Sequence, residues 1–198
     1  MNIAILTFEG FNELDSFIAL GILNRMKSSG YNVQITCPTD EVTSMNGVTI
    51  KAQQPLEFAN TADVVLFGSG MQTREVGSDP SILNRLQLDA SKQLICAQCS
   101  GTYLMAKLDL LGDVPACTDL TSKPWVIEAG VNVVDQPFTA SGNIATAGGC
   151  MASQYLATWV IAKISGQEAA ESAVHYVAPV GEKEITVKHS MAVVNPYI

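Results

Sequence analysis

A short apolar run that ends abruptly in a glycine-rich loop is the feature that most restricts how this chain can fold. The run Ala62-Asp63-Val64-Val65-Leu66-Phe67 is followed directly by Gly68-Ser69-Gly70. Continuous apolar runs of this length are typical of strands that are covered on both faces in a parallel sheet. The glycine-rich segment then marks a loop at the carboxyl end of the strand. The run therefore predicts an α/β fold.

Strand-like and helix-like patterns alternate along the rest of the chain, as crossover connections between parallel strands require. Asn46-Gly47 predicts a two-residue hairpin that decorates the sheet edge, and a second hairpin is expected at residues 140–143. We expect a flavodoxin-like three-layer sandwich with a mostly parallel central sheet. The expected strands are residues 3–6, 33–36, 62–67, 93–97, 131–134 and 144–146, and the expected helices are residues 15–29, 80–91, 102–110, 124–129, 150–164 and 166–176.

Length and composition favour one domain over residues 1–198. The chain has 198 residues, and 47% of them are hydrophobic, which supplies a core large enough to cover a sheet on two sides. No internal repeat, linker or low-complexity segment divides it. Residues 179–198 are expected to form a poorly packed C-terminal extension.

The charge of the chain restricts its partners. A formal net charge of -8 and a pI near 4.6 disfavour nucleic acid and anionic membranes, because both repel an acidic surface. The segment MNIAILTFEG lacks the basic region of a signal peptide, and no apolar stretch approaches the roughly 20 residues of a membrane span. We expect a cytoplasmic protein that acts on a small molecule.

Five cysteines are present, an odd number that makes a disulfide framework improbable in a chain without an export signal. Cys37 and Cys117 are interpreted as structural and Cys150 as a core residue. The two histidines, His175 and His189, have no cysteine at ligand spacing, so the sequence predicts no metal site. His175 is expected to be a packed or surface residue.

Cys99 occupies a position that favours nucleophilic chemistry. The strand 93–97 is followed by Gln98-Cys99-Ser100-Gly101 and then by a helical pattern, so Cys99 lies at a strand-to-helix elbow. Unpaired amides and the helix dipole at such a point stabilise a thiolate and lower the thiol pKa. A dithiol redox role for Cys96 and Cys99 is disfavoured, because Cys96 lies in the strand instead of opening the helix.

Three segments are expected to meet at the carboxyl ends of the strands, where open α/β sheets bind ligands. They are residues 9–15, Gly68 to Gly70, and Cys99. The amides of Gly68, Ser69 and Gly70 are candidate oxyanion donors. Asp15 and Glu13 supply carboxyl groups, and Asp15 fits a helix N-cap as well as a catalytic role. Because these loops contain no histidine, a cysteine-carboxyl pair is the simplest arrangement.

Four segments together resemble the ThiJ/PfpI superfamily, which is related to class I glutamine amidotransferases. They are Phe-Glu-Gly-Phe-Asn-Glu-Leu-Asp at residues 8–15, Val-Val-Leu-Phe-Gly-Ser-Gly at 64–70, Ala-Gln-Cys-Ser-Gly at 97–101 and Ile-Ala-Thr-Ala-Gly-Gly at 144–149. The likeness covers about residues 1–180 in the expected order. It implies the three-layer fold with Cys99 at the nucleophile elbow.

Within the superfamily the chain looks most like the isonitrile hydratase branch. Asp15, Cys99, Ser100 and Gly148-Gly149 match the acid, elbow and glycine turn of that branch. The resemblance implies a dimer that needs no cofactor. Relatives with peptidase or amidotransferase character carry a histidine near the nucleophile, whereas Ser100 follows it here and Asp119 stands where many relatives place a histidine, which disfavours triad hydrolysis.

Three hypotheses for function remain open at this stage. The first is hydration of an isonitrile to an N-substituted formamide through a Cys99 thioimidate, with Asp15 moving protons and the amides near Ser69, Ser100 and Gly101 stabilising charge. The second is glyoxalase-like or deglycase-like action on reactive aldehydes. The third is a non-enzymatic oxidative-stress sensor based on Cys99.

Overall fold

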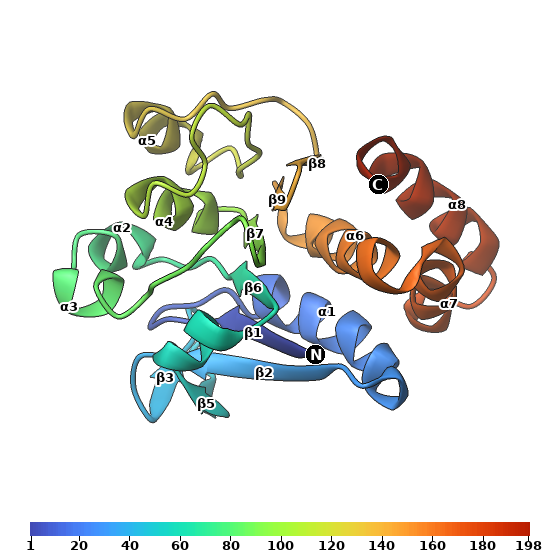
Figure 1. The fold of residues 1–198 in the computed structure, drawn as a ribbon, viewed down its shortest axis with the longest axis horizontal. Coiled ribbons are helices and arrows are strands. Elements are labelled where there is room, and N and C mark those ends of the chain that lie inside the picture. The colour runs from blue at the N-terminus through green and yellow to red at the C-terminus, as the bar shows by residue number, and fades with distance from the viewer.

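The computed structural model describes residues 1–198 and contains a central seven-stranded sheet (Figure 1). All neighbouring strands are parallel except the last pair, which is antiparallel. A separate two-stranded sheet pairs β3 (Glu41–Thr43) with β4 (Thr49–Lys51). The order across the main sheet is β5 (Gln54–Pro55), β2 (Asn32–Cys37), β1 (Asn2–Leu6), β6 (Val64–Phe67), β7 (Leu94–Gln98), β9 (Ile144–Ala147) and β8 (Phe138–Ser141).

This strand order confirms the predicted flavodoxin-like α/β fold. Strands β2, β1, β6, β7 and β9 lie in the 2-1-3-4-5 order of doubly wound sheets. The order reverses between β1 and β6, and ligands bind such sheets at the carboxyl ends of the strands beside the reversal. The loops after β1, β6 and β7 are therefore the segments positioned to build a site.

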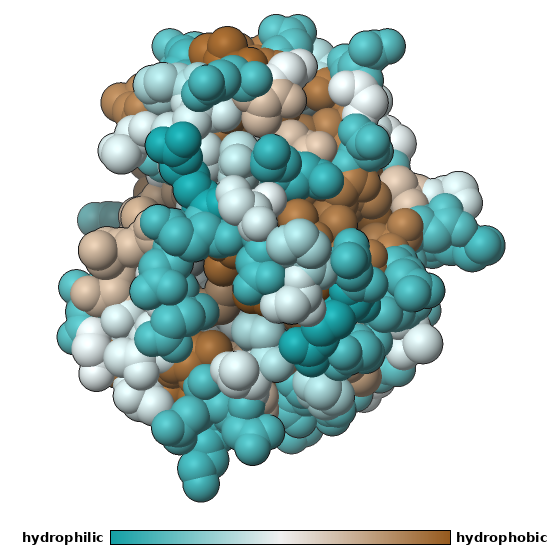
Figure 2. Space-filling view, turned by 90° about the vertical axis from the view of Figure 1, so that its left-hand side faces the viewer, coloured by the Kyte–Doolittle hydropathy of each residue, from teal (hydrophilic) through white to brown (hydrophobic).

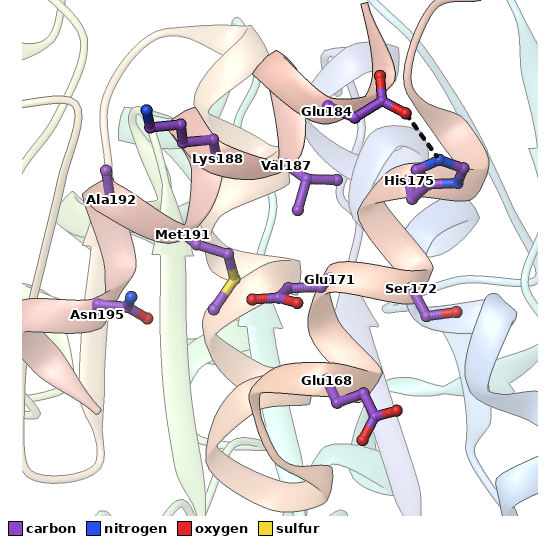
Figure 3. A pocket seen from close by; sticks show the side chains of 10 residues that line it. All are labelled: Glu168, Glu171, Ser172, His175, Glu184, Val187, Lys188, Met191, Ala192 and Asn195. Carbon is purple, nitrogen blue, oxygen red and sulfur yellow. Dashed lines mark ion pairs between the residues drawn. The ribbon is translucent and has the colours of Figure 1, made fainter.

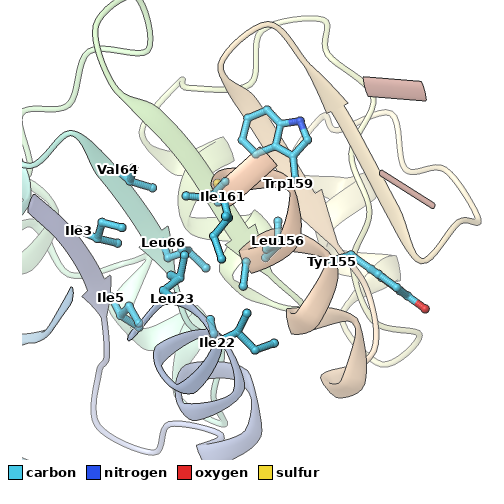
Figure 4. Packing of buried hydrophobic residues seen from close by; sticks show 14 of the residues in the cluster. Ile3, Ile5, Ile22, Leu23, Val64, Leu66, Tyr155, Leu156, Trp159 and Ile161 are labelled. Carbon is cyan, nitrogen blue, oxygen red and sulfur yellow. The ribbon is translucent and has the colours of Figure 1, made fainter. Parts of the chain in front are cut away.

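The central strands β1, β6, β7 and β9 are buried on both faces, which explains their continuous apolar sequence. Side chains alternate along each strand, so Ile3 and Ile5 of β1 enter one core while Ala4 and Leu6 enter the other. Figure 4 shows the first core, where side chains of β1 and β6 meet Ile22 and Leu23 of one helix and Leu156 of another. The sheet is thus the middle layer of three.

Helices cover the two faces unequally. The face of the first core carries the longer helices, and the opposite face carries short ones (Figure 1). The first group is α1 (Glu13–Leu23), α6 (Ser153–Ser165), α7 (Gln167–Val177) and α8 (Lys183–Val194), and the second is α2 (Thr73–Val76), α3 (Pro80–Leu83), α4 (Gly101–Lys107) and α5 (Lys123–Glu128). Single 3-10 segments are η1 (Asn24–Ser29), η2 (Leu56–Thr61), η3 (Cys150–Ala152) and η4 (Asn195–Tyr197).

The helix expected at residues 80–91 is wrong in length, because it ends at Leu83 after one turn. The next residues bond to the η2 segment instead of continuing the helix. Asn60 Nδ2 donates to the Arg85 carbonyl at 2.8 Å, and the Gln87 amide donates to Asn60 Oδ1 at 2.8 Å. These side-chain bonds replace the helical ones. Similarly, the first helix ends at Leu23 and residues 24–29 continue as the 3-10 segment η1.

Residues 131–134 do not form the expected sheet strand. They make only an isolated bridge, in which Val133 pairs with Ala116. The edge position next to β9 is taken by β8, which arrives through the predicted hairpin at residues 140–143. The hairpin at Asn46-Gly47 is also confirmed, although it closes the small separate sheet of β3 and β4 and adds no strand to the main one.

The C-terminal residues are well packed, contrary to expectation. Residues 183–194 form α8, which contacts α6 and α7 and buries Met191 and Val194 in the first core. Trp159 Nε1 of α6 donates to the Tyr197 carbonyl at 3.1 Å. The sequence pattern does not predict this packing, because the segment has few hydrophobic residues and only one narrow stripe of α8 is buried.

The side of the molecule that carries α3 and the β3–β4 hairpin is mostly hydrophilic, with apolar side chains gathered in separate areas (Figure 2). This surface agrees with the excess of acidic residues in the sequence. None of the helices combines the length and apolar character that a membrane span requires.

Candidate active site

Cys99 lies at a tight elbow between β7 and α4. Its φ of 49° falls in the left-handed region, which is unusual for a residue other than glycine. Hydrogen bonds fix this backbone on both sides. The Cys99 amide donates to the Ala147 carbonyl of β9 at 2.8 Å, and Thr118 Oγ1 donates to the Cys99 carbonyl at 2.9 Å. A strained residue held by several neighbours is a common sign of a functional position.

Glycine at position 101 allows the elbow to pack directly against the end of β6. A Cβ atom there would lie 2.6 Å from the Gly68 carbonyl oxygen and 2.7 Å from that of Phe67. Both neighbours are backbone atoms of a buried strand, so they cannot move aside cheaply. Gly101 therefore sets the distance between the Cys99 elbow and the Gly68 to Gly70 loop.

We expect Gly101→Ala to destabilise the protein by about 1 to 3 kcal/mol, the usual cost of overpacking a core. Chemical denaturation followed by circular dichroism measures this loss. Gly21→Ala is the matched control, since a Cβ atom at this position of α1 meets nothing within 4 Å. That variant should be neutral or slightly stabilising, because alanine favours helices. Equal stability of the two variants would contradict the proposed close packing.

Asp15 projects from the first turn of α1 and is fully buried. Ser69 Oγ donates a hydrogen bond to Asp15 Oδ2, whereas Asp15 Oδ1 is buried beside the Cys99 and Cys150 thiols without a hydrogen bond of ordinary geometry. The alternative that Asp15 is the N-cap is wrong. Asn12 is the N-cap, and its Oδ1 accepts a hydrogen bond from the Leu14 amide at 3.1 Å. The carboxyl group of Asp15 is therefore free of a capping role.

The side chains of Asp15, Cys99 and Cys150 form one cluster. The two sulfur atoms and a carboxylate oxygen lie within 4.8 Å of one another. Cys150 stands on a tight turn before a helix, directly after Gly149, which has a φ of 91°. The interpretation of Cys150 as a core residue is wrong, because Cys150 is partly exposed. The signal that could have found it is the parallel pairing of β7 with β9, which brings the loops after both strands together.

The electrostatic environment does not produce the lowered thiol pKa that the elbow suggested. Burial raises the pKa of the Cys99 thiol, and the nearby carboxylates of Asp15 and Asp119 raise it further. Burial also raises the pKa of Asp15, while its hydrogen bond from Ser69 acts in the opposite direction. The Asp15 carboxyl group lies close to the Cys99 sulfur, within the 4.8 Å cluster that both form with Cys150.

The candidate oxyanion donors divide into two groups. The Gly68 amide donates to the Leu6 carbonyl at 2.9 Å, which extends the pairing of β6 with β1, and the Gly70 amide donates to Ser100 Oγ at 3.2 Å. Both of these amides are therefore occupied, contrary to expectation. The amides of Ser69, Ser100 and Gly101 donate no hydrogen bond within the chain. These three amides remain able to bind developing negative charge.

The two other carboxyl candidates have different positions. Glu13 binds the turn between β3 and β4. Its carboxylate accepts hydrogen bonds from Ser44 Oγ at 2.5 Å and Asn46 Nδ2 at 2.8 Å. The Ser44 bond holds the pKa of Glu13 below its usual value. Asp119 does line the pocket, but its Oδ1 accepts from the amides of Thr121 and Ser122 and so stabilises the turn before α5. Neither carboxylate replaces Asp15.

The cluster lines a pocket of about 610 Å³. Its rim is partly apolar, with Met45, Met71, Leu120 and Trp125 among the lining residues, and none of the lining residues is a histidine. A larger cavity of about 770 Å³ lies between α7 and α8 (Figure 3). That cavity holds no cysteine, so we assign the chemistry to the smaller pocket.

The remaining cysteines and His175 lie away from this pocket. Cys37, Cys96 and Cys117 are buried, and burial raises the pKa of Cys37 and Cys117 to about 12. Cys96 packs in the first core, as expected for a strand residue. His175 is half exposed on α7, and its Nε2 lies 3.9 Å from Glu184 Oε1 (Figure 3).

Fold and site together define an α/β protein with a cysteine at a strand-to-helix elbow, at the carboxyl end of the parallel strand β7. The profile of the DJ-1/PfpI family matches residues 1–163, and the chain belongs to this family. No curated protein matches the sequence. The ThiJ/PfpI superfamily assignment made from the sequence is thereby confirmed, whereas the isonitrile hydratase branch stays a prediction.

Solved structures share this fold at low sequence identity. Drosophila melanogaster DJ-1beta has a TM-score of 0.78 and 19% identity over 89% of this chain and 96% of its own. A DJ-1 superfamily protein from Salmonella typhimurium, solved as a cysteine-to-alanine mutant, has a TM-score of 0.76 and 22% identity over 90% and 98%. The chain spans 49% of a two-domain Anabaena variabilis protein with DJ-1/ThiJ/PfpI-like and ferritin-like domains, at a TM-score of 0.71 and 18% identity over 85% of this chain.

Proposed function

We propose that this protein hydrates isonitriles to N-substituted formamides, with Cys99 as nucleophile and Asp15 as the proton-transfer group. The observation that carries the proposal is the placement of the Asp15 carboxyl within 4.8 Å of the Cys99 sulfur, in a pocket that no histidine lines. The DJ-1/PfpI family includes proteases, deglycases and hydratases. A cysteine-carboxyl pair without histidine fits hydration better than peptide hydrolysis.

The first step forms a thioimidate. The Cys99 sulfur attacks the terminal carbon of the isonitrile while Asp15 takes the thiol proton and passes it to that carbon. The product R–N=CH–S–Cys99 contains all atoms of the isonitrile and of the thiol. Burial raises the pKa of the Cys99 thiol, so a proton acceptor beside the sulfur favours the attack.

The second step releases the formamide. Water adds to the thioimidate carbon with Asp15 as base, and the nitrogen is protonated. The tetrahedral intermediate then collapses to R–NH–CHO and the free Cys99 thiol, so the overall reaction consumes one isonitrile and one water. The free amides of Ser69, Ser100 and Gly101 are the donors available to negative charge in this sequence.

The two alternative functions receive less support. Glyoxalase-like and deglycase-like relatives pair the cysteine with a histidine, and none lines this pocket. A peroxide sensor needs a thiolate at rest, whereas burial raises the pKa of the Cys99 thiol. Hydration can instead start from the thiol, with Asp15 as the proton acceptor.

The deciding experiment measures formamide from cyclohexyl isocyanide and p-nitrophenyl isocyanide in the presence of a metal chelator. We expect turnover by the wild type and only background with Cys99→Ala. Cys37→Ala is the matched control, because it removes a buried cysteine that does not line the pocket. Formamide production no greater than that of Cys99→Ala would refute the reaction. Lactate formation from methylglyoxal would instead support aldehyde chemistry.

The environment and assembly of the protein stay predictions. We propose a small-molecule substrate, a cytoplasmic location and a homodimer, without nucleic acid or membrane as partner and without a cofactor for the hydration reaction. Light scattering after size-exclusion chromatography tests the dimer, since the chain alone has a mass of 21.1 kDa.

A further inference from the structure

The cluster of Asp15, Cys99 and Cys150 has the composition and size of a metal-binding site. Two thiols and one carboxyl group come from the elbow after β7, the start of η3 and the first turn of α1, and their donor atoms lie within 4.8 Å of one another. Zinc bound at ordinary ligand distances holds sulfur at about 2.3 Å and carboxylate oxygen at about 2.0 to 2.2 Å. Only a small contraction of the cluster would bring the three donors to these distances.

An unsatisfied atom in the cluster points to a missing ligand. Asp15 is fully buried, Ser69 Oγ donates to its Oδ2, and its Oδ1 has no hydrogen-bond partner of ordinary geometry beside the neighbouring thiols of Cys99 and Cys150. Buried polar atoms without partners are rare and need an explanation. A cation between the carboxylate and the two sulfur atoms would supply the partner and would offset the repulsion among three groups that become anionic on losing a proton.

Each candidate ligand is oriented by a second residue. Ser69 Oγ donates to Asp15, Gln98 Nε2 donates to Cys99 Sγ at 3.2 Å, and Asn12 Nδ2 donates to Cys150 Sγ at 3.2 Å. Gln98 Nε2 also donates to the Gly149 carbonyl at 2.7 Å, which ties the two cysteine loops together. Outer partners of this kind hold the first ligands of metal sites in place.

We propose that Asp15, Cys99 and Cys150 bind one Zn²⁺ ion, with a fourth coordination position open to the pocket. Thiolate ligands favour zinc over magnesium and calcium, and three protein ligands with an open position are typical of reactive rather than structural zinc sites. Spacing in the sequence could not predict this site, because its three ligands are separated by 84 and 51 residues, from 15 to 99 and from 99 to 150.

The zinc site does not depend on the proposed hydration. A zinc-bound Cys99 sulfur is coordinated and cannot attack an isonitrile, so metal-bound and nucleophilic forms exclude each other. Zinc should therefore inhibit formamide production by the chelator-treated enzyme. If the hydration proposal fails, metal binding remains measurable by itself.

The experiment measures metal binding by the full chain after chelator treatment and reduction with a non-coordinating phosphine. Zinc affinity is obtained by competition with a chromophoric chelator, and cobalt substitution reports the ligands. The variants are Cys150→Ala, Cys150→Ser and the control Cys37→Ala, whose sulfur lies outside the cluster. Circular dichroism establishes that each variant is folded.

We expect one cobalt ion per chain, with a strong sulfur-to-metal charge-transfer band and the visible spectrum of tetrahedral cobalt. Both Cys150 variants should bind zinc at least about 100-fold more weakly, because loss of an outer partner alone costs about 10- to 100-fold. Cys37→Ala should bind as the wild type does. The proposal is overturned if folded Cys150→Ala keeps wild-type affinity, if cobalt binds without the charge-transfer band, or if no metal binds.

Discussion

Replacing Asp15 with asparagine should lower kcat for formamide formation by about 10²- to 10⁴-fold, the usual contribution of a general acid-base group. Asparagine keeps the size of the side chain but cannot accept the Cys99 proton. Burial raises the pKa of the Cys99 thiol, which increases the dependence of the attack on a proton acceptor. Steady-state kinetics with cyclohexyl isocyanide and a chelator measures the change.

Glu13→Gln is the matched control for this variant. Glu13 lies two residues before Asp15 in the same helical turn, but its carboxylate bonds to Ser44 and Asn46 of the hairpin side and does not line the pocket. It should retain activity within a few-fold of the wild type. A similar loss in both variants, or a kcat for Asp15→Asn close to that of the wild type, would remove Asp15 from the mechanism.

The stability of Asp15→Asn, measured by thermal unfolding, separates a loss of catalysis from a loss of folding. Burial raises the pKa of Asp15, so the folded state holds this proton more tightly than the unfolded chain does. The resulting stability is present below the ordinary aspartate pKa and is lost as pH rises through the raised value. Thermal unfolding should therefore show less loss of stability with rising pH for Asp15→Asn than for the wild type.

The part of the site that lies next to strands could be predicted from the sequence. The apolar run before Gly68 and the strand before Cys99 establish two parallel strands, and the carboxyl ends of parallel strands share one edge. Asp15 comes after the first strand, whose carboxyl end lies at the same edge of the sheet. The pairing of Asp15 with Cys99 thus depends only on local pattern and strand direction, and the structure places both in one pocket.

Other features depend on contacts that local pattern does not contain. Cys150 reaches the cluster through the order of β7 and β9 in the sheet, and the amide of Gly68 is occupied because β6 continues to pair with β1. The elbow pattern predicts a lowered thiol pKa because it shows a helix terminus but not the depth of burial. Residues from distant parts of the sequence, among them Asp119 and Cys150, line the pocket beside Cys99.

The docking of the C-terminal segment leads to the second large expected effect. Trp159→Ala should destabilise the protein by about 3 to 5 kcal/mol, as for other fully buried tryptophans. The ring packs beside Phe138 in the first core, and its Nε1 donates to the Tyr197 carbonyl. A fall in Tm of about 6 to 20 °C would follow for a chain of this size. Trp159→Phe should lose less, because it keeps an aromatic ring and gives up the hydrogen bond and only part of the buried side-chain volume. Trp125→Ala is the control, since this tryptophan lies at the pocket and is only partly buried. A loss for Trp159→Ala no larger than that for Trp125→Ala would show that α6 and the C-terminal residues are not packed as described.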